Sequence, residues 1–158
     1  MDIKTFKNVI NDILVPYGYK KKGTNSWIRK GDEISMKVYL QKSSFSCRYY
    51  FHCYYVINNM PKELKGKNET WSNETWSNMN YSDYKLLFNM CDLENGIPDE
   101  ERTKELQDIL NKDFSRHKYI ETEKDLKEML IKRDLPILIV IQKYLGIDMS
   151  DGNRKKEE

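Results

Sequence analysis

The chain lacks an apolar segment long enough to cross a membrane. Its longest uninterrupted apolar run covers residues 135–141, whereas a membrane-spanning helix needs roughly 20 apolar residues. Asp2, Lys4 and Lys7 interrupt the N-terminus, where the apolar core of a secretion signal would begin. The sequence therefore predicts a cytoplasmic protein that does not associate with membranes.

Cysteine is scarce, and the three cysteines present are not the even set typical of a disulfide framework. Cys47 and Cys53 fall on the same face of one expected strand, about 20 Å apart. That separation is too large for a disulfide bond. We expect reduced and mostly buried thiols, as is usual in the cytoplasm.

Patterns that mark metal sites and enzymes are also missing. There is no Cys-x-x-Cys or His-Glu-x-x-His spacing. His52 would point away from Cys47 and Cys53 on the expected strand, which argues against a Cys–His nucleophile pair. No glycine-rich loop could hold a phosphate, and no nucleophile elbow surrounds a serine. We expect no catalytic residue, no cofactor and no metal, with an enzyme lacking any recognisable motif as an alternative.

The excess of positive charge is small. The 158 residues include 27 Lys and Arg against 25 Asp and Glu, a net charge of +2, whereas strong basicity is the usual signature of nucleic-acid binding. A hydrophobic content of 39% is that of a globular protein rather than a disordered one. We predict a single domain over residues 1–149 and a charged, disordered tail over residues 150–158.

Two segments in the first third of the chain alternate in polarity. Every even position of residues 33–41 is apolar, and every odd position of residues 45–57 is apolar or aromatic. This period of two indicates β-strands with one buried face. Two-residue turns at 31–32 and 43–44 would join them to a shorter strand over 24–30 as an antiparallel meander. The expected pairs are Trp27 with Met36 across the first turn and Leu40 with Cys47 across the second.

Helical periodicity marks both ends of the chain. An apolar stripe follows the capping residue Asp2 and stops at Pro16. After the meander we expect a fourth strand over 84–93, and then two or three helices that begin near Pro98, Thr122 and Pro136. The order predicts an α+β fold: an N-terminal helix, an antiparallel β-meander of three to four strands, and two to three C-terminal helices packed on one sheet face.

The polar face of the meander is basic and aromatic, which is unusual for a surface that binds nothing. Such side chains are enriched at protein-interface hot spots, and they also stack on and contact single-stranded nucleic acid. A third interpretation is that a helix covers this face and makes its tyrosines part of the core. The candidate binding residues on it are Lys37, Tyr39, Arg48, Tyr50, His52 and Tyr54.

A five-residue repeat, Asn-Glu-Thr-Trp-Ser, occurs twice in residues 68–77. Its period fits neither a helix nor a strand, so we do not expect it to form an element of the fold. One interpretation is a local duplication in a tolerant loop. The other adds Trp71 and Trp76 to the candidate binding residues, as part of an aromatic loop that docks on a partner.

The N-terminal third resembles a known bacterial family, catalogued as domain of unknown function 4304, over about residues 3–57. The resemblance depends on the basic stretch at 18–23, Trp27, the turn at 40–43 and the aromatic strand at 49–55. Tyr19 stands where the family more often has phenylalanine, and Phe45 where it usually has tryptophan. The motif positions shared with the family are Lys21, Gly23, Trp27, Gln41 and Ser43.

The resemblance implies a function only indirectly, because the family has no assigned activity. Some members are encoded among toxin–immunity clusters, which implies a cytoplasmic immunity protein that binds and neutralises a bacterial toxin. Together with the candidate residues, this favours a non-enzymatic protein-binding domain. Single-stranded nucleic-acid binding by the same sheet face is the alternative. The sequence indicates neither the partner's identity nor the oligomeric state.

Overall fold

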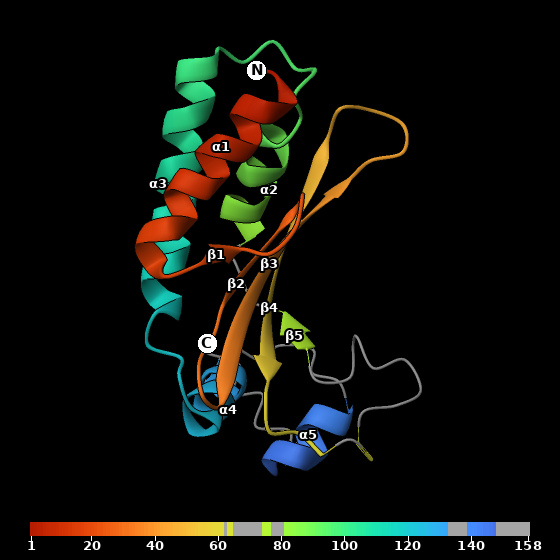
Figure 1. Cartoon of the computed structure of the whole chain (residues 1–158), viewed down its shortest axis with the longest axis vertical. Coiled ribbons are helices and arrows are strands. Elements are labelled where there is room, and N and C mark those ends of the chain that lie inside the picture. Colours follow the sequence, from red (N-terminus) through yellow and green to blue (C-terminus); the bar gives the residue numbers. More distant parts are fainter. Residues whose placement is uncertain (62, 65–73, 77–80, 133–138, 148–158) are drawn as a thin grey trace, which may run out of the picture.

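The chain forms an α+β fold in which helices cover one face of an antiparallel sheet (Figure 1). The computed structural model describes residues 1–61, 63–64, 74–76, 81–132 and 139–147. The N-terminal helix, the antiparallel sheet and the C-terminal helices of the prediction are confirmed. In chain order the elements are α1 Ile3–Leu14, a 3₁₀ turn Val15–Tyr17, β1 Lys20–Lys21, β2 Ser26–Arg29, β3 Ile34–Lys42, β4 Tyr49–Ile57, β5 Glu74–Trp76, α2 Tyr81–Met90, α3 Asp99–His117, α4 Glu123–Lys132 and α5 Ile139–Leu145.

Helix α1 begins and ends where its sequence predicts. The Asp2 carboxylate accepts hydrogen bonds from the backbone N–H groups of Lys4 (2.8 Å) and Thr5 (3.0 Å), which would otherwise have no partner in the first turn. After the 3₁₀ turn, Gly18 has a φ of +82°, a conformation that glycine adopts without strain. The apolar stripe of α1 is buried against the sheet, through Phe6, Ile10, Ile13 and Leu14.

The strands lie in sequence order, β1-β2-β3-β4-β5, and each pair is antiparallel. The inner face of β3 and β4 packs under α1 and α3: the ring centroids of Phe6 and Tyr49 are 5.3 Å apart, and those of Phe51 and Phe114 are 6.3 Å apart. Helices α4 and α5 lie at the end of the sheet opposite the β3–β4 turn (Figure 1). They extend the same core through Leu126, Leu130, Ile141 and Leu145.

The predicted strand register is wrong, but the predicted faces are right. Trp27 pairs with Val38 rather than Met36, and Leu40 pairs with Phe51 rather than Cys47. These shifts, of two residues (36 to 38) and four residues (47 to 51), are even, so each side chain stays on its expected side. Both turns are longer than two residues, since the last pair of the first hairpin is Arg29 with Met36 and that of the second is Lys42 with Tyr49.

Each turn has an identifiable support. In the first turn, the Asn58 side chain donates hydrogen bonds to the carbonyls of Gly31 (2.7 Å) and Asp32 (3.1 Å). In the second, the N–H of Ser43 donates to the carbonyl of Arg48 at 2.8 Å and closes a wide turn. Consequently β4 starts at Tyr49 rather than at residue 45.

The segment predicted as a fourth strand over 84–93 is the helix α2, so that prediction is wrong. Alternation and helical spacing overlap in this short segment, and tertiary packing decides between them. Leu87, Met90 and Cys91 are buried at helical spacing, whereas Tyr84 and Leu86 are exposed. The edge of the sheet beside β4 is occupied by β5 instead.

Strand β5 comes from the second copy of the repeat, which was not expected to form an element of the fold. Its backbone pairs with β4 through Trp76 and Tyr54, Thr75 and Tyr55, and Glu74 and Val56. Trp71 and the tail over residues 150–158 lie outside the described residues. The predicted helix start near Thr122 is confirmed at α4 by a capping box, in which the Asp125 N–H donates to Thr122 Oγ1 (3.1 Å) and the Thr122 N–H to Asp125 Oδ2 (2.9 Å).

Candidate functional site

The outer face of the sheet brings five of the six predicted meander residues together. Directly opposed residues of antiparallel strands point to the same face. The pairings therefore place side chains in rows across the outer face. One row is Lys20, Ile28, Lys37 and Tyr54; the next is Ser26, Tyr39 and His52; the third is Gln41 and Tyr50.

The solvent exposure of the side chains on this outer face decreases with distance from the β3–β4 turn. Tyr39 is 38% exposed and lies toward the β3–β4 turn, whereas Tyr54, farther along β4, is only 3% exposed. Lys37, Tyr50 and His52 lie between these extremes. Tyr54 therefore points to the predicted face without being open to a partner, and the accessible part of the face is its Tyr39 end.

Three rings form a nearly parallel row on this face. The centroids of Tyr39 and His52 are 6.3 Å apart with planes inclined by 18°, and those of His52 and Tyr54 are 6.0 Å apart at 13°. His52 Nε2 lies 2.9 Å from Gln41 Oε1, and the Lys37 ammonium lies 6.0 Å from the Tyr54 ring centroid. Partial burial lowers the pKa of His52, so the ring is neutral at pH 7 and lysines supply the positive charge.

This lowered pKa makes the fold depend on pH in a definite direction. Unfolded His52 binds a proton more readily than folded His52, so its contribution to stability is present above the ordinary histidine pKa of 6.5 and decreases as pH falls below it. We expect an NMR titration of the His52 ring to show a midpoint below 6.5. The His52→Gln variant identifies the resonance by its loss, and a midpoint at or above that of a free histidine would contradict the assignment.

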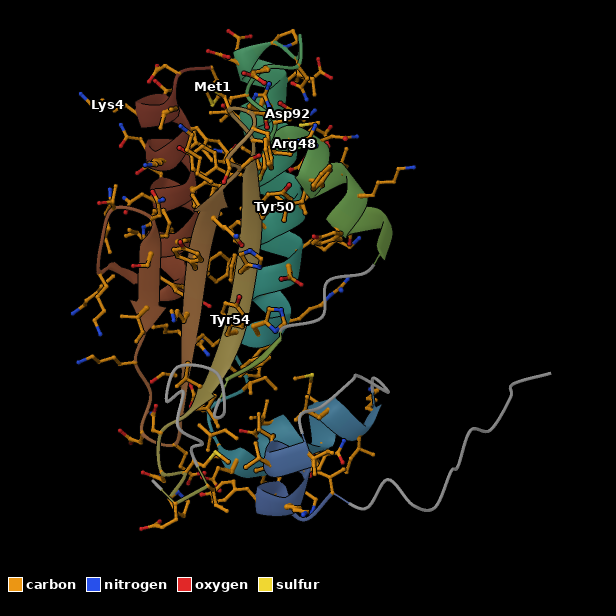
Figure 2. The ribbon with its side chains drawn as sticks, turned by 90° about the vertical axis from the view of Figure 1, so that its right-hand side faces the viewer. Met1, Lys4, Arg48, Tyr50, Tyr54 and Asp92 are labelled. Carbon is orange, nitrogen blue, oxygen red and sulfur yellow. The ribbon has the colours of Figure 1, made fainter. Side chains whose placement is uncertain are left out.

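Arg48 lies beside this face rather than on it. It precedes β4, forms an isolated β-bridge with Asp92, and makes an ion pair with the Asp92 carboxylate (Figure 2). Its guanidinium carbon is 4.5 Å from the ring centroid of Phe88 on α2. The hydrogen bond from Arg48 holds the pKa of Asp92 below its usual range. Arg48 therefore joins the β3–β4 turn to the segment after α2.

The segment after α2 is organised by Arg102, a fully buried residue of α3. Its guanidinium donates hydrogen bonds to the carbonyls of Met90 (2.5 Å) and Asp92 (2.8 Å) and to Asn95 Oδ1 (2.5 Å). Burial raises the pKa of the neighbouring Cys91 thiol to about 12, so this cysteine is not a nucleophile at neutral pH. Arg102 and Asp92 escaped sequence reasoning because neither falls in a motif and both act through partners distant in sequence.

A second buried polar group connects β4 to α3. The Tyr55 hydroxyl hydrogen-bonds to Nδ1 of His117. Nε2 of the same ring lies 3.1 Å from Asp113 Oδ2, without hydrogen-bond alignment. Exposures of 0%, 1% and 3% for Tyr55, His117 and Asp113 exclude direct contact with a substrate in this conformation. The order Asp–His–Tyr resembles a catalytic relay in composition only, because the three side chains are buried and His117 Nε2 is not hydrogen-bonded to Asp113.

Within the described ranges, no group of three or more His, Cys, Asp or Glu side chains could hold a metal ion. All three cysteines are free thiols, two of them buried. Among the residues with described positions, no helix is both long and apolar enough to span a bilayer.

Comparison with known proteins identifies a family and no individual relative. The family described as "Domain of unknown function (DUF4304)" matches residues 10–138, most of the chain. The chain belongs to this family. The match extends well beyond the N-terminal third that carries the motifs of the resemblance, and it includes α2, α3 and α4. No curated protein and no solved structure matches the chain, so the function of this DUF4304 domain has to be argued from its own residues.

Proposed function

We propose that this DUF4304 domain is a non-enzymatic binding protein that places the Tyr39 end of its outer sheet face against another protein. One observation carries the proposal. The outward positions of strands β1–β4 include two lysines, a histidine and three tyrosines, of which Tyr54 is buried, and no aspartate or glutamate. The one acidic residue beside them in the register is Glu74 of β5, opposite Val56. Aromatic side chains of this kind are enriched in the centres of protein interfaces.

The charge of the face favours an acidic partner surface. Lys20 and Lys37 belong to one row across the sheet, and opposite charges on a partner would select it and speed its association. Nucleic acid is the less favoured acidic partner, because His52 is neutral at pH 7 and two lysines neutralise few phosphates. The net charge of +2 adds little attraction.

The finer parts of the proposal concern the partner and the compartment. We propose a bacterial toxin as the partner, since the family resemblance implies an immunity protein. We propose the cytoplasm as the compartment, and three free thiols support it. A direct test is whether the chain restores growth to cells that express a toxin encoded beside it.

Tyr39→Ala is expected to weaken binding to the partner at least tenfold, about 1.4 kcal/mol, because the ring is the most exposed aromatic of the proposed face. Lys37→Glu should weaken binding to a similar extent by reversing a charge. The matched control is Tyr119→Ala, since Tyr119 is 69% exposed and lies beyond α3. The measurement is calorimetric titration with the partner purified from the native host.

Two results would overturn the proposal. One is equal affinity of the Tyr39→Ala and Tyr119→Ala variants for the partner. The other is recovery of single-stranded nucleic acid as the ligand, with an affinity that falls steeply as salt rises.

A further inference from the structure

The most exposed large apolar side chain among the described residues lies at the tip of the β3–β4 turn. Phe45 is 99% exposed, although its position in the alternating pattern predicted a buried strand residue. The turn projects sideways from the sheet, on the side away from α1 and α3 (Figure 1). A phenyl ring with no intramolecular contact area contributes almost nothing to the stability of the fold, so its presence there needs another explanation.

Hydrogen bonds hold the turn that carries Phe45, both within the turn and at its base. Within the turn, the Phe45 N–H donates to Ser43 Oγ at 3.2 Å. At its base, Tyr49 donates to the Cys91 carbonyl (2.9 Å), and Leu93 donates to the Cys47 carbonyl (3.2 Å). The Arg48–Asp92 ion pair closes the same junction. These bonds fix the base of the turn in the folded protein. Binding through Phe45 therefore costs less conformational entropy than binding through a freely moving loop.

We propose that Phe45 is the anchor residue of the interface, and that it enters an apolar pocket of the partner protein whose acidic surface lies over Lys37 and Lys20. This inference rests on the proposed function, because it specifies how the partner of the same face is held. Lys37 and Lys42, the last residue of β3, are five residues apart, about 17 Å along a strand. The partner's apolar pocket and its acidic patch are therefore expected to lie on the order of 17 Å apart.

The surroundings of Phe45 favour a protein pocket over a lipid or nucleic-acid surface. The adjacent turn residues Ser43, Ser44 and Ser46 are uncharged. Leu93 is bonded to the Cys47 carbonyl at the base of the turn, and the next residue, Glu94, is exposed, so its carboxylate would disfavour anionic lipid or phosphate at this junction. Stable membrane binding also takes more apolar area than a single ring.

A photo-crosslinking experiment tests the inference separately from the proposed function. The full chain is prepared with p-benzoylphenylalanine at position 45, at position 39 or at position 119, and is irradiated in soluble extract of the native host. We expect positions 45 and 39 to crosslink the same protein and position 119 not to do so. That protein, once purified, should bind the Phe45→Ser variant at least tenfold more weakly than the wild-type chain. Burial of a phenyl ring at an interface raises the affinity about tenfold to a hundredfold.

The controls separate binding from folding. Phe45→Trp keeps a large apolar ring and should retain affinity within about threefold, while Phe45→Ser should leave the thermal midpoint within about 2 °C because the ring is exposed. Crosslinking from position 39 alone, or crosslinking from position 45 to a second copy of this chain, to lipid or to nucleic acid, would overturn the inference and leave the proposed function standing. Absence of crosslinks from both positions would overturn both.

Discussion

The Arg102→Met variant is expected to lose about 3–5 kcal/mol of unfolding free energy. Methionine fills much of the same volume, but it donates no hydrogen bond. The carbonyls of Met90 and Asp92 and the side-chain oxygen of Asn95 would then lose their partner. Buried acceptors without partners cost about 1–3 kcal/mol each, more than an exposed salt bridge contributes.

A matched control lies on the same helix. Arg116 is exposed on α3, and Arg116→Met should change the unfolding free energy by no more than about 0.5 kcal/mol. The measurement is urea unfolding of both variants at neutral pH. Arg102→Lys should fall between wild type and Arg102→Met, because an ammonium keeps the charge but cannot span all three acceptors. Equal midpoints for the Arg102→Met and Arg116→Met variants would show that the segment after α2 is held by other contacts.

The side-chain faces of the meander were predictable from the sequence, whereas its register was not. Alternation determines which residues of β3 and β4 point inward, because burial of one face is a local consequence of the period of two. The register depends on where each turn closes. Asn58 and Asp92 decide that from outside the turns, and no pattern within the hairpins reports their positions.

The candidate site divides in the same way. Five of the candidate residues share a face as predicted, because the alternation along each strand alone places them there: Lys37, Tyr39, Tyr50, His52 and Tyr54. The burial of Tyr54 and the ion pair that holds Arg48 depend on packing of distant segments. Phe45 shows the opposite kind of error. Its odd number places it on the buried side of the alternating pattern, but β4 begins only at Tyr49, so the ring lies in the turn and is exposed to solvent.

The polar group under β4 gives the second large effect. His117→Ala is expected to destabilise the fold by about 3–5 kcal/mol. The substitution removes a hydrogen-bond partner of the Tyr55 hydroxyl, removes the ring whose Nε2 lies 3.1 Å from the Asp113 carboxylate, and opens a cavity beside Phe114. His52→Ala is the matched control, because it deletes the other histidine from the half-open outer face, where we expect a loss of about 1 kcal/mol or less.

A double-mutant cycle tests whether the size of the His117 effect depends on the Asp113 carboxylate. Asp113→Asn preserves the shape of the side chain but removes the buried carboxylate. If the stranded charge causes much of the loss, His117→Ala should cost at least about 1 kcal/mol less in the Asp113→Asn background than in the wild type. Additive losses in urea unfolding would show that His117 acts through its volume and its bond to Tyr55 alone. In that case the 3.1 Å approach of Nε2 to Asp113 is proximity without energetic coupling.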